Sequence, residues 1–368
     1  MFVRGGVERP HGWALRALMD SVGPLAYAGP GMDTLAARIE RAAEEHAFSG
    51  VVSVFRGASR EYHEAFGYRD VAEGLPNTTD TLFGIASGTK LFTAVGIGVL
   101  IDQGRIALDA TVRDILGEHL GFLGEHLGFV DERATIRQLL THTSGIYDYL
   151  DETLVSDIER ITVQIPWYEL DTPSDYLPLF EGQTMQTRSG ERYAYSNGGY
   201  VFLAILLERV ARARYRDVIR EHILRPTGME RSGFHSFDDL PPNTARGYLA
   251  DRTTSNVDRL PRRGGGDGGM YTTSEELRAF WDALVGGRLL SEALTRTFLR
   301  THHTFDEERG YGCGVYTRHD GSLYAIEGSD AGVGFASMYR PSEKRCVNVL
   351  SNVTCGDEGM VEAVQRAL

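Results

Sequence analysis

The chain has 368 residues, of which 42% are hydrophobic and 24% are charged, as in an ordinary globular protein. This length allows two or three structural units with a sizeable core. The sequence contains no apolar run of about 18 residues, so we predict no membrane span. The net charge of −13 disfavours nucleic acid as a partner, because acidic surfaces repel its phosphate backbone.

The first 31 residues are interpreted as an N-terminal extension. The Ala-Tyr-Ala sequence at 26–28 resembles a signal-peptidase site, but Arg16 and Asp20 precede it where an export signal should be apolar. The sequence therefore favours a cytoplasmic protein over an exported one.

The next hundred residues carry clear hydrophobic patterns. Residues 32–47 show helical periodicity, and 51–55 and 61–66 are typical of two strands in an antiparallel hairpin. Residues 87–103 are apolar on every side after their first turn and are followed by Gly104, a good helix stop. A helix that is apolar all round is predicted to be buried.

The middle of the chain, 105–270, is predicted to be mainly helical and rich in loops, with one strong helix from 199 to 213. A glycine-rich junction at 262–269 separates it from the C-terminal part. That part is expected to contain a helix at 274–286, strands at 311–318, 323–326, 334–339 and 346–350, and a final helix at 357–367.

This order predicts an α/β (α+β) fold, in which an antiparallel sheet built from both ends of the chain is flanked by helices. Residues 32–104 and 271–368 would form the sheet domain. Residues 105–270 would form an inserted, mainly helical domain, and 1–31 the extension.

Metal and disulfide chemistry have little support in the sequence. The three cysteines lack CxxC spacing and cannot all pair within one chain. A repeated heptapeptide, at 117–123 and 124–130, contributes His119 and His126, but no third ligand stands nearby. We therefore predict neither a disulfide scaffold nor a metal site.

The first motif that could carry chemistry is Ser87-Gly88-Thr89-Lys90, at the start of the predicted buried helix. A serine there is commonly only an N-cap, but it could also be a nucleophile whose oxyanion is stabilised by the helix dipole. Lys90 lies one turn along the same face, among apolar residues where a charged amine is costly unless paired.

The choice of lysine at position 90 favours the nucleophile. Of the 38 basic residues, only Lys90 and Lys344 are lysines. Burial lowers the pKa of a lysine and lets it act as a general base, which arginine cannot do. The sequence therefore predicts a Ser–Lys pair.

A second motif, Tyr195-Ser196-Asn197, precedes the predicted helix at 199–213. One interpretation is a turn with an N-cap asparagine. Beside a Ser–Lys pair, the alternative is a tyrosine that relays a proton and an asparagine that holds a substrate amide or carbonyl.

Together these motifs resemble the serine β-lactamase and penicillin-binding-protein superfamily. The closest branch contains class C β-lactamases, D-Ala-D-Ala carboxypeptidases, D-aminopeptidases and family VIII esterases. The resemblance covers nearly the whole chain from about residue 32. Besides SxxK and YxN it rests on 135–146 (TIRQLLTHTSGI), 225–229 (RPTGM), 245–248 (ARGY) and 268–273 (GGMYTT) with Glu276 and Leu277.

The resemblance implies roles for individual residues. Ser87 would attack an acyl carbonyl and become an acyl-enzyme, and Lys90 would accept its proton. Tyr195 would be the partner base and later donate a proton to the leaving group, and Asn197 would contact the substrate. The N–H groups of Ser87 and Ser329 would form an oxyanion hole.

Other polar residues are not assigned a catalytic role. His142 and Ser144, within 135–146, are interpreted as turn and packing residues. The segment that follows, 147–149, could line a pocket.

The third element of the superfamily, a strand with Lys-Thr-Gly or His-x-Gly, is altered here. The best match is 326–332 (IEGSDAG), where Gly328 fits, Ile326 replaces the basic residue, and a shifted register offers only Glu327. In the superfamily this basic residue helps to bind the carboxylate of a β-lactam or peptide. Glu327 and Asp330 would each repel an anion by about 1 kcal/mol or more, unless both are only cap or turn residues.

The predicted function is a serine hydrolase that acts through an acyl-enzyme on Ser87, an esterase or an amide or peptide hydrolase with weak β-lactamase activity. Substrates would be small neutral or amine-bearing acyl compounds: esters, amides, lactones or short peptides. The alternatives are a true β-lactamase or D-Ala-D-Ala carboxypeptidase, and a non-catalytic binding protein with the penicillin-binding fold. No cofactor is called for, and the sequence does not indicate the oligomeric state.

Overall fold

The structure is a computed structural model that describes residues 34–117, 127–155 and 157–368. The predicted N-terminal extension, His119 and His126 lie outside the described residues. Within the described ranges, no helix is long and apolar enough to cross a membrane.

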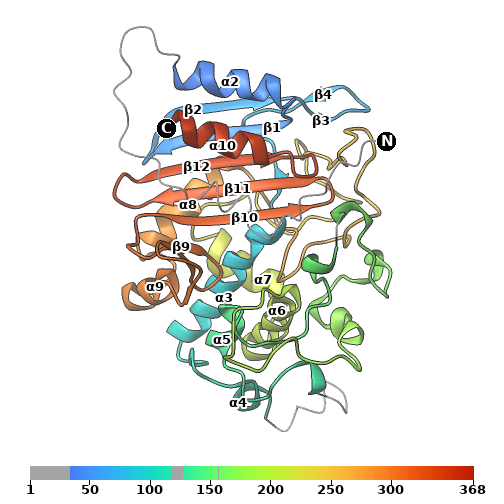
Figure 1. The fold of residues 1–368 in the computed structure, drawn as a ribbon, viewed down its shortest axis with the longest axis vertical. Coiled ribbons are helices and arrows are strands. Elements are labelled where there is room, and N and C mark those ends of the chain that lie inside the picture. The colour runs from blue at the N-terminus through green and yellow to red at the C-terminus, as the bar shows by residue number, and fades with distance from the viewer. Residues whose placement is uncertain (1–33, 118–126, 156) are drawn as a thin grey trace, which may run out of the picture.

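An antiparallel sheet of eight strands forms one half of the molecule, in the order β2-β1-β12-β11-β10-β9-β8-β7 (Figure 1). β1 and β12 are paired along their whole length, so strands from the N-terminal and C-terminal parts of the chain lie side by side within the sheet. This confirms the predicted fold class. The strands are β1 (Gly50–Arg56), β2 (Ser59–Phe66), β7 (His303–Thr304), β8 (Arg309–Tyr311), β9 (Tyr316–Arg318), β10 (Tyr324–Asp330), β11 (Val333–Arg340) and β12 (Arg345–Ser351).

Both faces of the sheet are buried. Helices α2 (Leu35–Glu45) and α10 (Glu358–Ala367) cover one face and pack on Val52 and Val54. Helix α8 (Ser274–Val285), which lies behind the sheet in Figure 1, covers the other face, where Val51 and Phe55 point. Successive strand residues point to opposite faces, so a strand buried on both sides is mostly apolar along its length.

The helical part lies next to β10, on the lower side in Figure 1. Its central helix, α3 (Thr89–Asp102), is buried from Thr89 to Leu100, as the uniformly apolar sequence predicted. Phe92 of α3 stacks on Phe280 of α8 with ring centroids 4.1 Å apart. The other α-helices are α4 (Val112–Leu116), α5 (Ile136–Leu140), α6 (Asn197–Ala211), α7 (Tyr215–Ile219) and α9 (Glu292–Leu299).

Short elements complete the described chain. Two small ladders pair β3 (Tyr68–Asp70) with β4 (Leu75–Pro76) and β5 (Phe83–Gly84) with β6 (Tyr271–Thr272). A single π-helical segment, η8 (Arg220–Leu224), follows α7. The 3₁₀ turns are η1 (Ala86–Gly88), η3 (Leu127–Phe129), η4 (Glu152–Leu154), η5 (Ile158–Arg160), η6 (Trp167–Glu169) and η7 (Pro173–Leu179).

One predicted strand is wrong. The segment 311–318 is not continuous, because the chain reverses between β8 and β9. The N–H of Gly312 donates to the carbonyl of Val315 at 2.8 Å, and Gly314 adopts φ 77°, which glycine reaches without strain. The remaining predicted helices and strands are present, with ends shifted by a few residues.

The predicted domain boundaries stay a prediction. α3 comes from the range assigned to the sheet domain, yet it packs against α6 of the helical range within one continuous core. The segments that matter for function, η1, β10 and the start of α6, meet where the sheet and the helices join.

Candidate active site

Ser87 lies in η1, between β5 and α3. It is not the N-cap of α3, because Gly88 takes that position without any side-chain cap. Ala86, just before it, has φ 42°, a left-handed conformation that is unfavourable for a residue with a side chain. Such strain is common where a structure forces a functional side chain into position. The Ser87 hydroxyl is therefore presented to the surroundings instead of capping the helix.

Lys90 lies one turn further on and is only 2% exposed. Its Nζ contacts three oxygen atoms: Ser87 Oγ at 2.8 Å, Asn197 Oδ1 at 2.7 Å and the carbonyl oxygen of Asp267 at 2.7 Å. Two of these atoms can only accept hydrogen bonds, which limits how the amine can be oriented.

The amide of Asn197 is fixed in turn. Its Nδ2 donates to the carbonyl of Leu150 at 3.0 Å and to Glu152 Oε1 at 3.1 Å, so Oδ1 faces Lys90. A neutral amine would give its two N–H groups to Asn197 and Asp267. Its lone pair would then point at Ser87 Oγ, in the orientation that a general base needs.

Electrostatics at Lys90 act in two directions. Burial lowers the pKa of its amine. Four nearby acids raise this pKa, each by less than burial lowers it: Asp267, Glu152, Asp148 and Asp330. Removal from water therefore dominates and favours the neutral amine.

Tyr195 contacts the same serine from the other side. Its hydroxyl lies 3.0 Å from Ser87 Oγ, and burial raises the pKa of the phenol well above its ordinary value. The phenol thus keeps its proton at neutral pH. The Lys90 Nζ lies 5.0 Å from the centroid of the Tyr195 ring, so all three groups form one cluster.

Comparison with known proteins identifies the family of this chain. The sequence profile of the Beta-lactamase family matches residues 35–368. The chain belongs to the Beta-lactamase family. It is 30% identical over 271 residues to a penicillin-binding protein of Bacillus subtilis, which aligns with 69% of this chain but only 56% of that relative's length.

Solved structures show the same fold. A penicillin-binding protein from Bacillus halodurans is 34% identical, with a TM-score of 0.82 over 90% of this chain and 100% of that chain. A D-amino acid amidase from Ochrobactrum anthropi is 22% identical, with a TM-score of 0.72 over 90% of this chain and 98% of that chain. At that identity the second likeness concerns the fold alone.

The segment that matches the third family motif lies on β10. Ile326, at the position of the basic residue, is 3% exposed and belongs to the main core. Side chains alternate along a strand, so Gly328 and Asp330 share the face of Ile326 toward η1. Glu327 turns to the opposite face, where it hydrogen-bonds with Tyr316 and burial raises its pKa to about 8.

The backbone of β10 comes very close to the nucleophile. A Cβ on Gly328 would overlap the carbonyl oxygen of Ile85 and lie 2.7 Å from Ser87 N. Strand β9 pairs only with Tyr324 and Ala325, and no other described strand covers that edge of β10. The side chain of Ser329 points away, with Oγ 3.4 Å from Cys355 Sγ, so only its backbone is available to the site.

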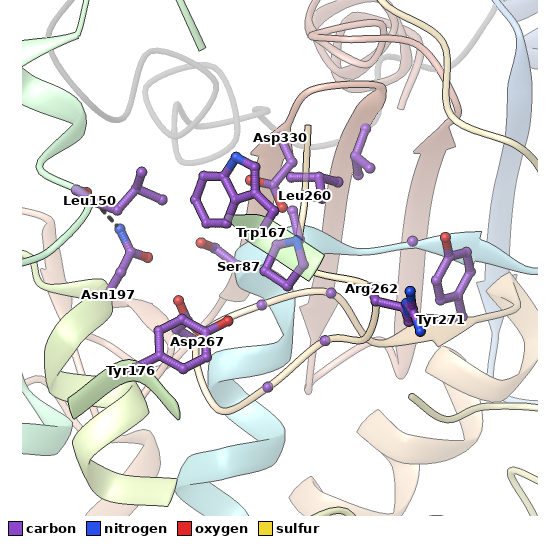
Figure 2. A pocket seen from close by; sticks show the side chains of 18 of the residues that line it. Ser87, Leu150, Trp167, Tyr176, Asn197, Leu260, Arg262, Asp267, Tyr271 and Asp330 are labelled. Atoms are coloured by element: carbon purple, nitrogen blue, oxygen red, sulfur yellow. Dashed lines mark hydrogen bonds between the residues drawn. The ribbon is translucent and has the colours of Figure 1, made fainter. Parts of the chain in front are cut away.

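A pocket opens in front of Ser87, between Asn197 on one side and Tyr271 on the other (Figure 2). Its wall carries the carboxylates of Glu152, Asp267 and Asp330. Apolar and aromatic side chains form the rest: Leu150, Trp167, Tyr176, Phe237, Leu260, Pro261 and Val333.

The ionisable side chains of this pocket are mainly acidic. Asp267 accepts a hydrogen bond from Tyr149 at 2.6 Å, and burial raises the pKa of Asp330 to about 8. Arg262 is the one arginine in the described wall, and it forms an ion pair with Asp238 at 3.1 Å.

The structure brings Ser87, Lys90, Tyr195 and Asn197 together, although they come from two distant segments. Asp330 reaches the pocket wall, whereas Glu327 is not part of it. Sequence reasoning missed Glu152 and Asp267. Asp267 could have been noticed as the one charged residue within the glycine run 264–269, but nothing in the sequence singles out Glu152.

Proposed function

We propose that this protein is a serine hydrolase that forms an acyl-enzyme on Ser87 and hydrolyses small amides or esters that carry an amine. We further propose that it turns over anionic β-lactams poorly. The observation that carries the proposal is the position of Ser87 Oγ between Lys90 Nζ at 2.8 Å and the Tyr195 hydroxyl at 3.0 Å.

The geometry supports the following reaction. Neutral Lys90 takes the Ser87 proton as Oγ attacks the substrate carbonyl, and the N–H groups of Ser87 and Ser329 stabilise the oxyanion. Tyr195 donates its proton to the leaving amine or alcohol and recovers one from Lys90. Water then attacks the acyl-enzyme, and Lys90 and Tyr195 again accept and donate the protons. This step restores Ser87.

The charge of the pocket supports the choice of substrate. Penicillins carry a carboxylate, which would meet Asp330 and Glu152 and would find no lysine at position 326. A substrate ammonium would instead be attracted to these acids, while its acyl group packs on Trp167. A D-amino acid amidase shares this fold, and amino acids carry such an amine.

Covalent labelling tests the nucleophile. A fluorophosphonate probe is expected to react once with each protein molecule, which mass spectrometry detects as the added mass of one probe. Ser87→Ala is expected to abolish this adduct. A matched control, Ser59→Ala in the exposed part of β2, should label like the parent. If folded protein is labelled neither by fluorophosphonates nor by a penicillin-type probe, the alternative of a non-catalytic binding protein is correct.

An isosteric pair of esters tests the preference for cations. The p-nitrophenyl ester with a terminal trimethylammonium group is expected to exceed its tert-butyl analogue in kcat/KM by about 10-fold, because the two differ only in charge. Since the pKa of Asp330 is about 8, its ionised fraction rises between pH 7 and 9, and the ratio should rise with it.

At pH 9, where Asp330 is mostly ionised, Asp330→Asn is expected to lower this ratio about 5-fold, and it should flatten the pH dependence of the ratio. Asp320→Asn, the same side-chain change in the exposed turn between β9 and β10, should leave the ratio intact. Equal kcat/KM values for the two esters would contradict the proposed substrate class. Efficient hydrolysis of nitrocefin would contradict it as well and would favour a true β-lactamase.

A further inference from the structure

His142 lies directly behind Tyr195. It follows α5, is 1% exposed, and adopts φ 55°, a left-handed conformation that is uncommon outside glycine. Its ring and that of Tyr195 have centroids 4.3 Å apart and are tilted by 32°. A buried polar residue with a left-handed backbone, in contact with a reacting side chain, calls for an explanation.

Two hydrogen bonds attach the chain around Tyr195 to this one residue. The carbonyl oxygen of His142 accepts from the N–H of Ala194 at 2.8 Å, and its Nδ1 accepts from the N–H of Ser196 at 3.1 Å. The residues on both sides of Tyr195 are therefore held by His142. Ser196 is also the N-cap of α6, where its Oγ accepts from the N–H of Gly199 at 2.9 Å.

The imidazole is neutral in this environment. Burial holds the pKa of His142 well below its ordinary value. Because Nδ1 accepts a hydrogen bond, the proton of the neutral ring is on Nε2, which is buried without a hydrogen-bond partner among the described residues. An unsatisfied buried donor is costly, so the ring is not explained by stability alone.

We infer that His142 is a positioning residue for Ser87 chemistry, which holds the Tyr195 hydroxyl at Ser87 Oγ through the hydrogen bond from the Ser196 N–H to its Nδ1. The ring contact with Tyr195 limits the tilt of the phenol. This inference rests on the proposed function, because it assigns His142 a part in acylation through Tyr195. His142 itself touches neither Ser87 nor the pocket wall.

Two substitutions distinguish the effect of the hydrogen bond to His142 from the effect of its side-chain volume. Asparagine offers Oδ1 close to the position of Nδ1 and tolerates the left-handed backbone, whereas leucine fills similar space without an acceptor. His142→Leu is expected to lower the single-turnover acylation rate about 20-fold with a p-nitrophenyl ester, with KM within about 2-fold of the parent. His142→Asn is expected to retain about a third of the parent rate or more.

The decisive comparison is a double-mutant cycle with Tyr195→Phe. If His142 acts through the Tyr195 hydroxyl, leucine at 142 should change the acylation rate less than about 2-fold once that hydroxyl is absent. An equal 20-fold loss in both backgrounds would overturn the inference. Parent-like acylation by His142→Leu would overturn it as well.

Folding of the variants and acylation of the parent protein are checked separately. If His142→Leu does not fold, His142→Asn carries the test in both backgrounds, and a loss as large as that of Tyr195→Phe contradicts the hydrogen-bond role. If the parent protein is not acylated at Ser87, the proposed function itself fails. If the parent is acylated and the His142 variants behave like it, only this inference fails.

Discussion

Replacing Lys90 with arginine is expected to lower kcat/KM for every acyl substrate by about 10³-fold, because the general base is lost while the positive charge stays. In the structure Lys90 is buried and directs its Nζ at Ser87 Oγ, with Asn197 and Asp267 as its other partners. A guanidinium has no lone pair to accept the serine proton. The rate of fluorophosphonate labelling should fall in parallel.

The chain supplies its own control for this substitution. Its one other lysine, Lys344, lies in the turn between β11 and β12, so Lys344→Arg makes the same chemical change away from Ser87. Lys344→Arg is expected to keep parent activity. Circular dichroism and thermal unfolding show whether the Lys90 variant is folded. A folded Lys90→Arg protein with full activity would exclude Lys90 as the base and leave that role to Tyr195.

The sequence was sufficient for most of the fold because buried elements leave plain patterns. Residues 51–55 and 346–350 are apolar except for Ser53 and Asn348, which hydrogen-bond to each other, and both segments form strands that are covered on two faces. The segment 311–318 was mispredicted because its apolar residues outweighed Gly312 and Gly314, whose turn marks the end of β8. Short strands and α9 have too few residues to show a period.

The site could be predicted in part, for a related physical reason. Ser87 and Lys90 are one helical turn apart, so local spacing alone brings them together. The carbonyl of Asp267 contacts Lys90 from 177 residues away, and a backbone oxygen leaves no mark in the sequence. The sequence analysis placed Glu327 near the pocket because a short motif does not reveal which residues of a strand point to which face. In the structure, Glu327 lies on the opposite face of β10 from Gly328 and points toward Tyr316.

Gly328→Ala is expected to lower kcat by about 10² to 10³-fold, the range seen when one oxyanion-hole donor is lost. The added methyl group would overlap the carbonyl oxygen of Ile85 and lie 2.7 Å from Ser87 N, and both are backbone atoms that cannot rotate away. β10 must therefore shift from η1, which moves the Ser329 N–H away from the substrate oxygen. KM should change much less than kcat, because the oxyanion forms only during reaction.

Gly233→Ala provides the matched control for this change. A Cβ on Gly233 would meet only the side chain of His235, at 3.5 Å, which is ordinary van der Waals contact. It should retain parent kcat and thermal stability. If folded Gly328→Ala kept parent kcat as well, the β10 backbone would not form the oxyanion hole. The donors would then have to lie on η1 alone, and the altered third motif of this chain would have no part in acylation.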